Sequence, residues 1–287
     1  MAKFVPDVKT QRWIVISPAR QARPSEQKEK EKGNRLCPFC EGNEHLTPPE
    51  VMRIGRGEKD KAGWKIRVVP NKFPITDIHE VIIHSPDHQK DIGDFDNAHN
   101  ELLLSTYRSR YQMHTSDGQV MIFCNHGEHA GASLAHPHSQ LVVIPRQINL
   151  DALVREPVMN VIEDNNFFVT YCPDFSQWPY EVWIAPKKNN STFGEIGDEE
   201  LKDLAVILRR TLKKLSIKHS NSNMEMEKMH LIYPFAYNFY IHHEKNWFIR
   251  IIPRLIHRAG FELGTGLSVN VVDPVQAARE LMEIRID

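Results

Sequence analysis

The stretch FCNHGEHAGASLAHPHSQLVVIPR, residues 123–146, sets His136 and His138 one proline apart between two runs of β-favouring residues. Alternation along an extended segment predicts that both imidazoles point to the same side, and Pro137 limits the backbone freedom between them. Two imidazoles held in this way could be two metal ligands, two catalytic groups, or one of each. The segment therefore predicts a strand that carries chemistry.

Composition narrows the class of protein. The 287 residues can bury a large core in one large domain or two smaller ones. Lys and Arg number 36 and Asp and Glu 37, so strong attraction to nucleic acid or to a membrane surface is not indicated. Four cysteines do not indicate a disulfide scaffold, and the N-terminus lacks the apolar stretch of a secretion signal. We expect a cytoplasmic protein with neither nucleic-acid nor membrane partners.

The chain contains an internal repeat of the pattern strand, helix, strand, strand. In the first half the predicted elements are a strand and its exit at 79–88, a helix at 94–112, and strands at 120–128 and 136–146. In the second half they are a strand at 180–186, a helix at 196–215, and strands at 238–244 and 244–254. The helix at 196–215 places leucines at 201, 204, 208, 212 and 215 on one face. This pattern predicts an α+β chain of two related halves.

Both halves close on the same tripeptide, Ile-Pro-Arg, at residues 144–146 and 252–254. Counting back from it, His138 falls opposite Asn246 and Gln140 opposite Phe248, so only the first half carries the histidine at the key position. A chance match of two short patterns is the alternative to duplication. We expect the halves at residues 1–160 and 161–287.

The sequence also predicts one connecting helix and two polar segments. The pattern of residues 148–160 predicts a connecting helix between the halves. Residues 25–34 are charged and poor in apolar side chains, which predicts a mobile loop, and residues 224–229 are similarly polar and weakly patterned.

Cys37-Pro38-Phe39-Cys40 is a C-x2-C knuckle, whose two thiolates can coordinate one soft cation. A redox pair or two buried cysteines would show the same spacing. A zinc site needs further ligands, and the candidate histidines are those at 79, 84, 88, 136 and 138. The knuckle with His88 and His136 would make a closed, structural Cys2His2 site, although a solvated loop histidine is the commoner interpretation of His88 alone.

If His136 binds metal, His138 is available for chemistry. A neutral imidazole beside phosphate-binding donors is a competent nucleophile at phosphorus. It needs a hydrogen bond on its other ring nitrogen, and donors for the charge on the phosphate oxygens. Residues 131–133 (Gly-Ala-Ser) and the amide of Gln140 offer such donors. The alternatives are that both histidines bind zinc, or that both are packed polar residues.

The motifs CPFC, SPARQARP, VVPNKFP, SPDH, NHGEHAGASLAHPHSQ and IIPR, in this order, resemble the galactose-1-phosphate uridylyltransferase family, a branch of the histidine-triad superfamily. The resemblance runs from about Trp13 to the C-terminal helix. It implies two histidine-triad-like repeats, each an antiparallel sheet with a long helix, forming one pseudo-symmetric unit. It also implies a homodimer that acts on nucleotide sugars and sugar phosphates.

The resemblance also implies roles for individual residues. One structural zinc per chain, with no organic cofactor, would be held by Cys37, Cys40, His88 and His136. His138 would be the nucleophile that carries a nucleotidyl group. The substrate-binding positions implied in the same way are Arg20, Arg23, Asn71, Asn125, Ser133 and Gln140.

The reaction that the resemblance implies is a two-step exchange. UDP-glucose gives its uridylyl group to His138, and galactose 1-phosphate then removes it. Relatives that phosphorolyse ADP-glucose or dinucleoside polyphosphates carry similar motifs, and a zinc-stabilised nucleotide-binding module without turnover is the non-enzymatic alternative. Many family members carry a second metal site around His-Trp-His, where this chain has Asn246, Trp247 and Phe248, so we expect no second metal at His242.

Overall fold

The computed structural model describes residues 2–9, 12–22, 36–150, 153–226 and 234–286. These residues form a ten-stranded antiparallel sheet and a separate two-stranded hairpin, β1 (Lys3–Asp7) with β2 (Arg12–Ile16). The strands of the large sheet are β3 (Met52–Gly55), β4 (Trp64–Pro70), β5 (His79–Ile83), β6 (Gln119–His126), β7 (His138–Ile144), β8 (Val161–Asp164), β9 (Phe168–Tyr171), β10 (Val182–Pro186), β11 (Tyr237–Ile241) and β12 (Ile249–Pro253).

The strand order across the large sheet is β3-β4-β5-β7-β6-β11-β12-β10-β9-β8. Strands of residues 1–160 occupy one end of the sheet and strands of residues 161–287 the other. The ends meet where β6 pairs antiparallel with β11, with Asn125 opposite Asn238. Read from its outer edge, each end has the same order of strands along the chain. The predicted α+β class with antiparallel pairing is therefore confirmed.

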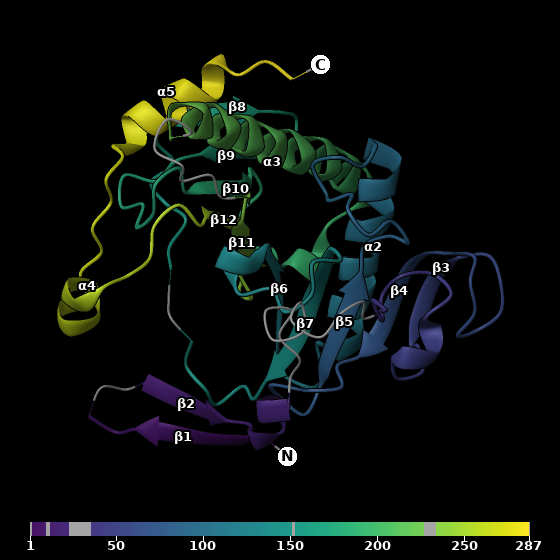
Figure 1. The fold of residues 1–287 in the computed structure, drawn as a ribbon. Helices are drawn as coiled ribbons and strands as arrows, with labels where there is room; N and C mark the ends of the chain where they lie inside the picture. Colours follow the sequence, from purple (N-terminus) through teal and green to yellow (C-terminus); the bar gives the residue numbers. More distant parts are fainter. Residues whose placement is uncertain (1, 10–11, 23–35, 151–152, 227–233, 287) are drawn as a thin grey trace.

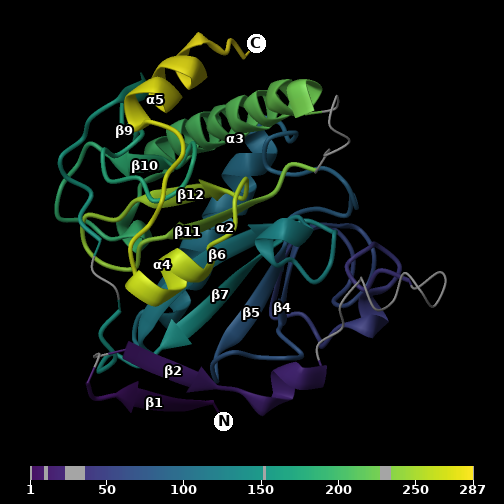
Figure 2. The same cartoon turned by 60° about the vertical axis from the view of Figure 1, so that its left-hand side comes forward.

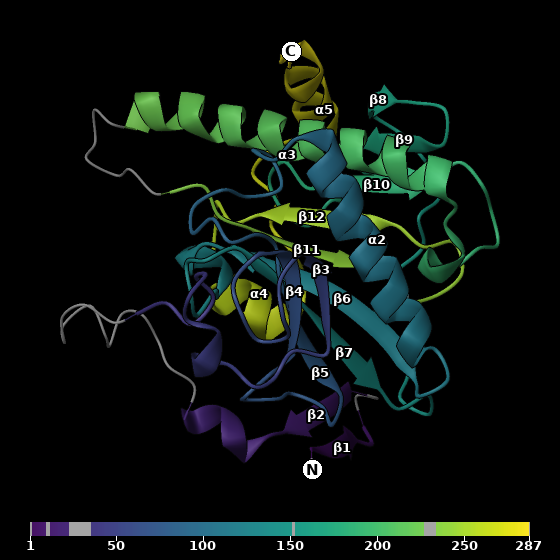
Figure 3. The same cartoon turned by 90° about the vertical axis from the view of Figure 1, so that its right-hand side faces the viewer.

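The helices lie mainly on one face of the sheet. Figure 3 shows α2 (Asn97–His114) and α3 (Asp198–Met226) in front of the strands, with α4 (Gly260–Thr265) behind them. Helix α5 (Pro274–Glu283) lies beside α3, near β8. The five leucines of the predicted helical face in α3 are at most 2% exposed. Their burial against the strands explains why this helix covers the sheet.

Short 3-10 turns interrupt the connections and bring loops toward the sheet. They are η1 (Pro18–Ala22), η2 (Glu44–Leu46), η3 (Glu128–Ala130) and η4 (Phe193–Glu195). Turn η3 lies between β6 and β7, and its N-cap residue is Gly127, which has a φ of +82°. A Cβ atom at Gly127 would lie 2.9 Å from the Cβ of Ala236, so a larger side chain would force the loop away from β11.

The strands and helices predicted for the two repeats all occur, with shifted ends. The first helix begins at Asn97, where the side chain of Asp96 accepts a hydrogen bond from the backbone N–H of His99 at 2.7 Å. The second helix continues to Met226, well beyond residue 215, into the stretch that we expected to be weakly patterned. Strands β3, β4, β8 and β9 are additional to the predicted pattern.

The predicted connecting helix at 148–160 is wrong: the described residues of this segment have no helical structure. Pro157 explains this, because proline inside a helix removes a hydrogen bond and clashes with the preceding turn. The predicted mobile loop at 25–34 lies outside the described residues, as do residues 227–229.

The N-terminal hairpin stands below the large sheet, as Figure 2 shows, and is tied to the loop after β4. The backbone N–H of Ala2 donates to Asp77 Oδ1 at 2.9 Å, and Ser17 Oγ donates to the carbonyl of Pro74 at 2.7 Å. In the described part of the chain, no helix is both long enough and apolar enough to cross a bilayer.

Candidate metal centre and nucleotidyl-transfer site

The C-x2-C knuckle is a tight turn closed by its own backbone. The N–H of Cys40 donates to the carbonyl of Cys37 at 3.3 Å, and the side-chain amide of Asn43 donates to the same carbonyl at 2.9 Å. Gly42 adopts φ +92°, which favours glycine. These contacts turn both thiols toward one point.

Two histidines meet the thiols at that point. Cys40 Sγ lies 3.3 Å from Nδ1 of His88 and 3.6 Å from Nδ1 of His136, while Cys37 Sγ lies 3.7 Å from the latter. All four ligand atoms lie within 4.8 Å of one another. Zinc bonds of about 2.3 Å to sulfur and about 2.0 Å to nitrogen, at the tetrahedral angle, imply S···N separations of about 3.5 Å. These four residues could therefore hold a metal ion.

The surroundings of the cluster favour a bound cation. Nε2 of His136 donates to the carbonyl of Ser85 at 2.8 Å, which leaves the lone pair of Nδ1 facing the thiols. Burial lowers the pKa of His136 to about 4, so its imidazole is neutral at physiological pH. Burial also raises the pKa of Cys37 to about 11, and a cation would stabilise the thiolate that burial disfavours.

His138 begins β7 and takes no part in this cluster. Its Nδ1 lies 2.8 Å from the carbonyl oxygen of His136, which can only accept, so Nδ1 carries the proton. Nε2 of His138 therefore holds the lone pair. The rings of His136 and His138 both contact Phe39 edge-on, with centroids 6.1 and 5.2 Å away. The predicted placement of the two imidazoles on one side is consistent with this shared contact.

A hydrogen-bonded set of polar side chains lies beside His138 on the same face of the sheet. Nδ1 of His79 accepts from the backbone N–H of Ile75 at 2.9 Å, so its Nε2 donates to Oε1 of Gln140, also at 2.9 Å. Asn71 Nδ2 donates to that oxygen at 3.4 Å. Since the carbonyl of Gln140 is occupied in this way, its NH2 group is the part that can face a phosphate.

The opposite face of β7 carries a buried polar contact. Ser139 Oγ lies 2.8 Å from Nε2 of His84 and 2.6 Å from the hydroxyl of Tyr107 in α2. The backbone N–H of His84 also donates to the carbonyl of Pro137 at 3.2 Å. His84 thus contacts Pro137 and Ser139, the residues before and after His138, and fixes their positions.

The other predicted substrate-binding residues occupy different parts of the same region. Arg20 donates to the carbonyl of Phe73 at 3.0 Å, and the N–H of Phe73 donates to Oδ1 of Asn71, which links the N-terminal segment to Gln140. Asn125 accepts from Asn238 Nδ2 at 2.8 Å. Ser133 lies half-buried in the loop between η3 and β7. Arg23 lies outside the described residues.

Several candidate metal ligands and neighbours take other roles. Of the five candidate histidines, only His88 and His136 reach the thiols; His79 contacts Gln140, and His84 contacts Ser139. Phe39 and Asn238 were not predicted. The position of Phe39 between the two cysteines was an available signal, whereas Asn238 depends on the pairing of β6 with β11.

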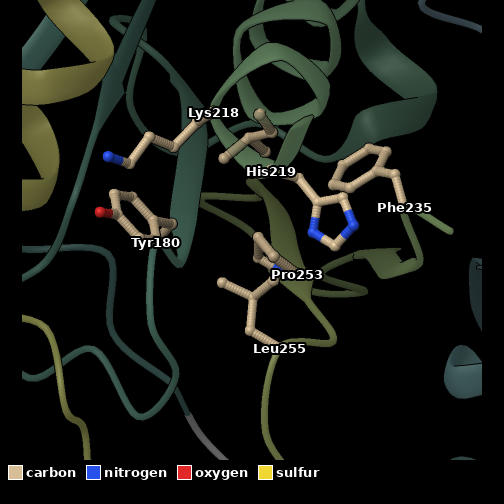
Figure 4. A pocket seen from close by; sticks show the side chains of 7 residues that line it. Tyr180, Lys218, His219, Phe235, Pro253 and Leu255 are labelled. Carbon is tan, nitrogen blue, oxygen red and sulfur yellow. The ribbon is translucent and has the colours of Figure 1, made fainter. Parts of the chain in front are cut away.

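A pocket on the helical side of β12 is separate from this site. Figure 4 shows its lining: Tyr180, Leu215, Lys218, His219, Phe235, Pro253 and Leu255. Its one ammonium group, on Lys218, already pairs with Glu280 at 2.9 Å. The pocket contains none of the predicted site residues.

Known proteins are similar to this chain in sequence and in fold. ADP-glucose phosphorylase of Arabidopsis thaliana is 28% identical over 98% of this chain and 92% of the relative. Galactose-1-phosphate uridylyltransferase of Thermotoga maritima is 27% identical over 97% of both chains. Both relatives belong to the superfamily that the motifs around His138 resemble. A crystal structure of the Arabidopsis ADP-glucose phosphorylase with bound ADP-glucose superposes on this chain with a TM-score of 0.72, 26% identity and full coverage of both chains.

A family model described as the N-terminal domain of a domain of unknown function, DUF4931, matches residues 19–146 of this chain. The matched range contains the knuckle, His88 and the segment from Asn125 to Gln140. The half with the cysteine-histidine cluster is thus the part that this model matches.

Replacement of one thiol tests the metal cluster. We expect Cys37→Ser to lower bound metal from about one ion per chain and to lower the melting temperature, because a closed site contributes to folding. Metal analysis of the purified protein with scanning calorimetry measures both. Cys172→Ser, which removes a buried thiol outside the cluster, should keep the metal. Equal metal content in Cys37→Ser would contradict the assignment.

Proposed function

We propose that the protein is a nucleotidyltransferase that carries the nucleoside monophosphate of a nucleotide sugar on Nε2 of His138. The observation that carries this proposal is the tautomer of His138, whose Nδ1 proton is held by the carbonyl of His136. An imidazole fixed in this way presents a lone pair and is both a good nucleophile and a good leaving group. The neighbouring amide of Gln140 supports it as a donor to a phosphate oxygen.

The first step forms an N–P bond between Nε2 of His138 and the α-phosphorus of the donor. The bond between that phosphorus and the bridging oxygen breaks, and the sugar phosphate leaves with the electron pair. In the second step an acceptor phosphate oxygen attacks the same phosphorus and displaces the imidazole. The acceptor is already ionised at neutral pH, so this step needs no general base. Arg20, Arg23 and Ser133 are proposed to contact the phosphates, and Asn71 and Asn125 the rest of the substrate.

For the substrates, the leading proposal is uridylyl transfer from UDP-glucose to galactose 1-phosphate. It is supported by the resemblance of the motifs around His138 and by the Thermotoga relative, a galactose-1-phosphate uridylyltransferase. The second candidate is phosphorolysis of ADP-glucose, with inorganic phosphate as acceptor. The similarity to the Arabidopsis ADP-glucose phosphorylase, over nearly the whole of both chains, supports that candidate.

We propose that the ion at Cys37, Cys40, His88 and His136 is zinc. Two thiolates and two imidazoles at tetrahedral spacing suit this soft, redox-inactive cation. Protein ligands fill all four positions, so the ion would be structural. It would hold the knuckle and the backbone of His136 in place, and with them the acceptor of the His138 proton.

We also propose that the halves, residues 1–160 and 161–287, are two repeats that have diverged in chemistry. Aligned on Ile-Pro-Arg and on strand pairing, the polar positions beside the nucleophile are Asn71, His79 and Gln140. In the second half the corresponding positions are Tyr171, Trp183 and Phe248. There the rings of Trp183 and Phe248 stack at 4.0 Å, which supports a packed wall rather than a second site.

A homodimer is proposed from the apolar surface that this chain leaves uncovered. In and after α4, the side chains of Phe261, Leu263 and Leu267 are 55%, 75% and 61% exposed. Figure 1 shows α4 standing away from the strands at the end of an extended segment. An exposed apolar patch of this kind is typical of a protein interface. A second copy of the chain is the proposed occupant.

The covalent step is tested by trapping. On mixing with UDP-glucose or ADP-glucose and rapid quenching, we expect the mass of the protein to rise by one nucleoside monophosphate on His138. His138→Gly should lose at least about a thousandfold in turnover and regain part of it with free imidazole. Ser116→Gly, outside the site, is the control. Undiminished turnover in His138→Gly would refute the nucleophile.

The acceptor is tested by pairing each nucleotide sugar with galactose 1-phosphate or with inorganic phosphate and identifying the products. We expect UDP-glucose and galactose 1-phosphate to give UDP-galactose, with parallel double-reciprocal lines. Release of ADP from ADP-glucose by inorganic phosphate alone would instead favour the phosphorylase. Inertness toward inorganic phosphate with every donor would exclude that candidate.

Oligomeric state is tested by light scattering. We expect a mass of twice 33.3 kDa for the unmodified chain. The double variant Leu263→Asp, Leu267→Asp should dissociate to the single-chain mass, because buried carboxylates would have no partner at an apolar interface. Met113→Asp, at an exposed position of α2, should leave the mass unchanged. A single-chain mass for the unmodified protein would contradict the homodimer.

A further inference from the structure

Arg254 follows β12 and is directed to the face of the sheet that carries His138. Its neighbours Pro253 and Leu255 line the pocket on the opposite, helical side together with Leu215 (Figure 4). Successive side chains of an extended strand alternate between faces. The backbone N–H of Arg254 continues the ladder by donating to the carbonyl of Ala236, so this alternation extends to residue 254.

Two guanidinium groups share one indole at this place. The Cζ atoms of Arg254 and Arg258 lie 4.6 and 5.1 Å from the ring centroid of Trp178. Arg258 is held in place by donating to Oε1 of Gln177 at 2.9 Å and to Oγ of Ser268 at 3.2 Å. Burial, and then the charge of Arg258, lower the pKa of Arg254. Two like charges have thus been fixed side by side.

Neither guanidinium forms an ion pair within the described part of the chain, although the carboxylate of Glu262 feels the charge of Arg258 from farther away. Among the ion pairs of those residues, no carboxylate lies within 4.0 Å of Arg254 or Arg258, and Nε of Arg254 is buried without a hydrogen-bond partner. Arg146, which has the same place in the first Ile-Pro-Arg, instead donates to the carbonyls of Thr115 and Ser116. The tripeptide itself therefore does not require an unpaired arginine.

The arginine pair adjoins the loop that leads to the nucleophile. The ring of His257, between the two arginines in sequence, lies 5.8 Å from the ring of His129 in η3. Asn238 holds the same turn by donating to the carbonyl of Ala130 at 2.9 Å. Turn η3 continues into the loop of Ser133, so the basic group and the phosphate-binding loop share one surface.

The pair is too far from His138 to bind the phosphate that reacts there. Across the sheet, Ser139 lies opposite Cys124, which lies opposite Phe239, which lies opposite Ile251. These three strand spacings amount to about 14 Å. Arg254 lies three residues farther along β12 and its extension. Both guanidinium groups lie over Trp178, which belongs to the connection between β9 and β10, on the side of β12 away from β7. We therefore infer that an anion bound by the arginines is a different group from the one attacked by His138.

We propose that Arg254 and Arg258, stacked on Trp178, bind a second phosphate group carried by a substrate whose first phosphate reacts at His138. This rests on the proposed function and names a substrate class for it: a sugar or other acceptor bearing two separated phosphates, or a polyphosphate chain. Arginine suits this role because its planar fork binds phosphate oxygens through two parallel hydrogen bonds.

The test measures binding rather than turnover. Calorimetric titration of the metal-loaded protein compares glucose 1-phosphate with glucose 1,6-bisphosphate, and separately with inorganic tripolyphosphate. We expect at least one of the two multiply phosphorylated probes to bind about tenfold or more tightly than glucose 1-phosphate. Arg254→Gln and Arg258→Gln should each remove most of this advantage, while Arg146→Gln should keep it.

The outcomes separate the two possible sources of the second phosphate. An advantage for the bisphosphate alone indicates a phosphorylated sugar, and one for tripolyphosphate alone a polyphosphate chain. No advantage for either probe, or an advantage that persists in both arginine variants with normal circular dichroism, would overturn the inference. Mass analysis of the same protein preparations after mixing with UDP-glucose or ADP-glucose reports independently on the His138 adduct and so on the proposed function. Failure of one is therefore distinguishable from failure of the other.

Discussion

The hydrogen bond from Nδ1 of His138 to the carbonyl of His136 is the interaction on which the proposed chemistry depends. It selects the tautomer of the nucleophile and fixes the plane of its ring. The accepting carbonyl belongs to a residue whose own ring is held between the carbonyl of Ser85 and the two thiols. The cysteine-histidine cluster thus orients the proposed nucleophile through the backbone, without itself contacting the substrate.

The two ends of the sheet have the same order of strands but carry different side chains at corresponding positions. Near His138 the face of the sheet away from the helices carries amides and an imidazole that hydrogen-bond to one another, and the NH2 group of Gln140 is left for a ligand. At the corresponding place in the second half, stacked rings and the buried pair of Glu181 with Arg250 fill the surface. A continuous core nevertheless runs through both ends, from Ile66 to Leu281. The polar face near His138 is therefore supported by a core to which both ends of the sheet contribute.

How much could be predicted from the sequence differs from feature to feature. The cysteine knuckle and His136 could be placed together because few chemistries satisfy two thiols and an imidazole. The bond between His79 and Gln140 could not, since a neutral amide and an imidazole have many possible partners and only strand register selects one. Strand β3 is short and contains Arg53, so its period is weak. The unpaired state of Arg254 depends on which carboxylates are absent nearby, which no local pattern encodes.

Ser139 has a consequence for how this fold tolerates change. Its hydroxyl is held between His84 and Tyr107, so β7 has a polar anchor on its core side as well as its reactive side. The backbone N–H of His84 also donates to the carbonyl of Pro137, so the same side of the sheet fixes the residue that joins His136 to His138. A one-residue slip within the strand would bury the imidazole of His138 among apolar side chains and turn a hydroxyl toward the ligand. Changes of length among descendants of this sequence should therefore be purged from this strand.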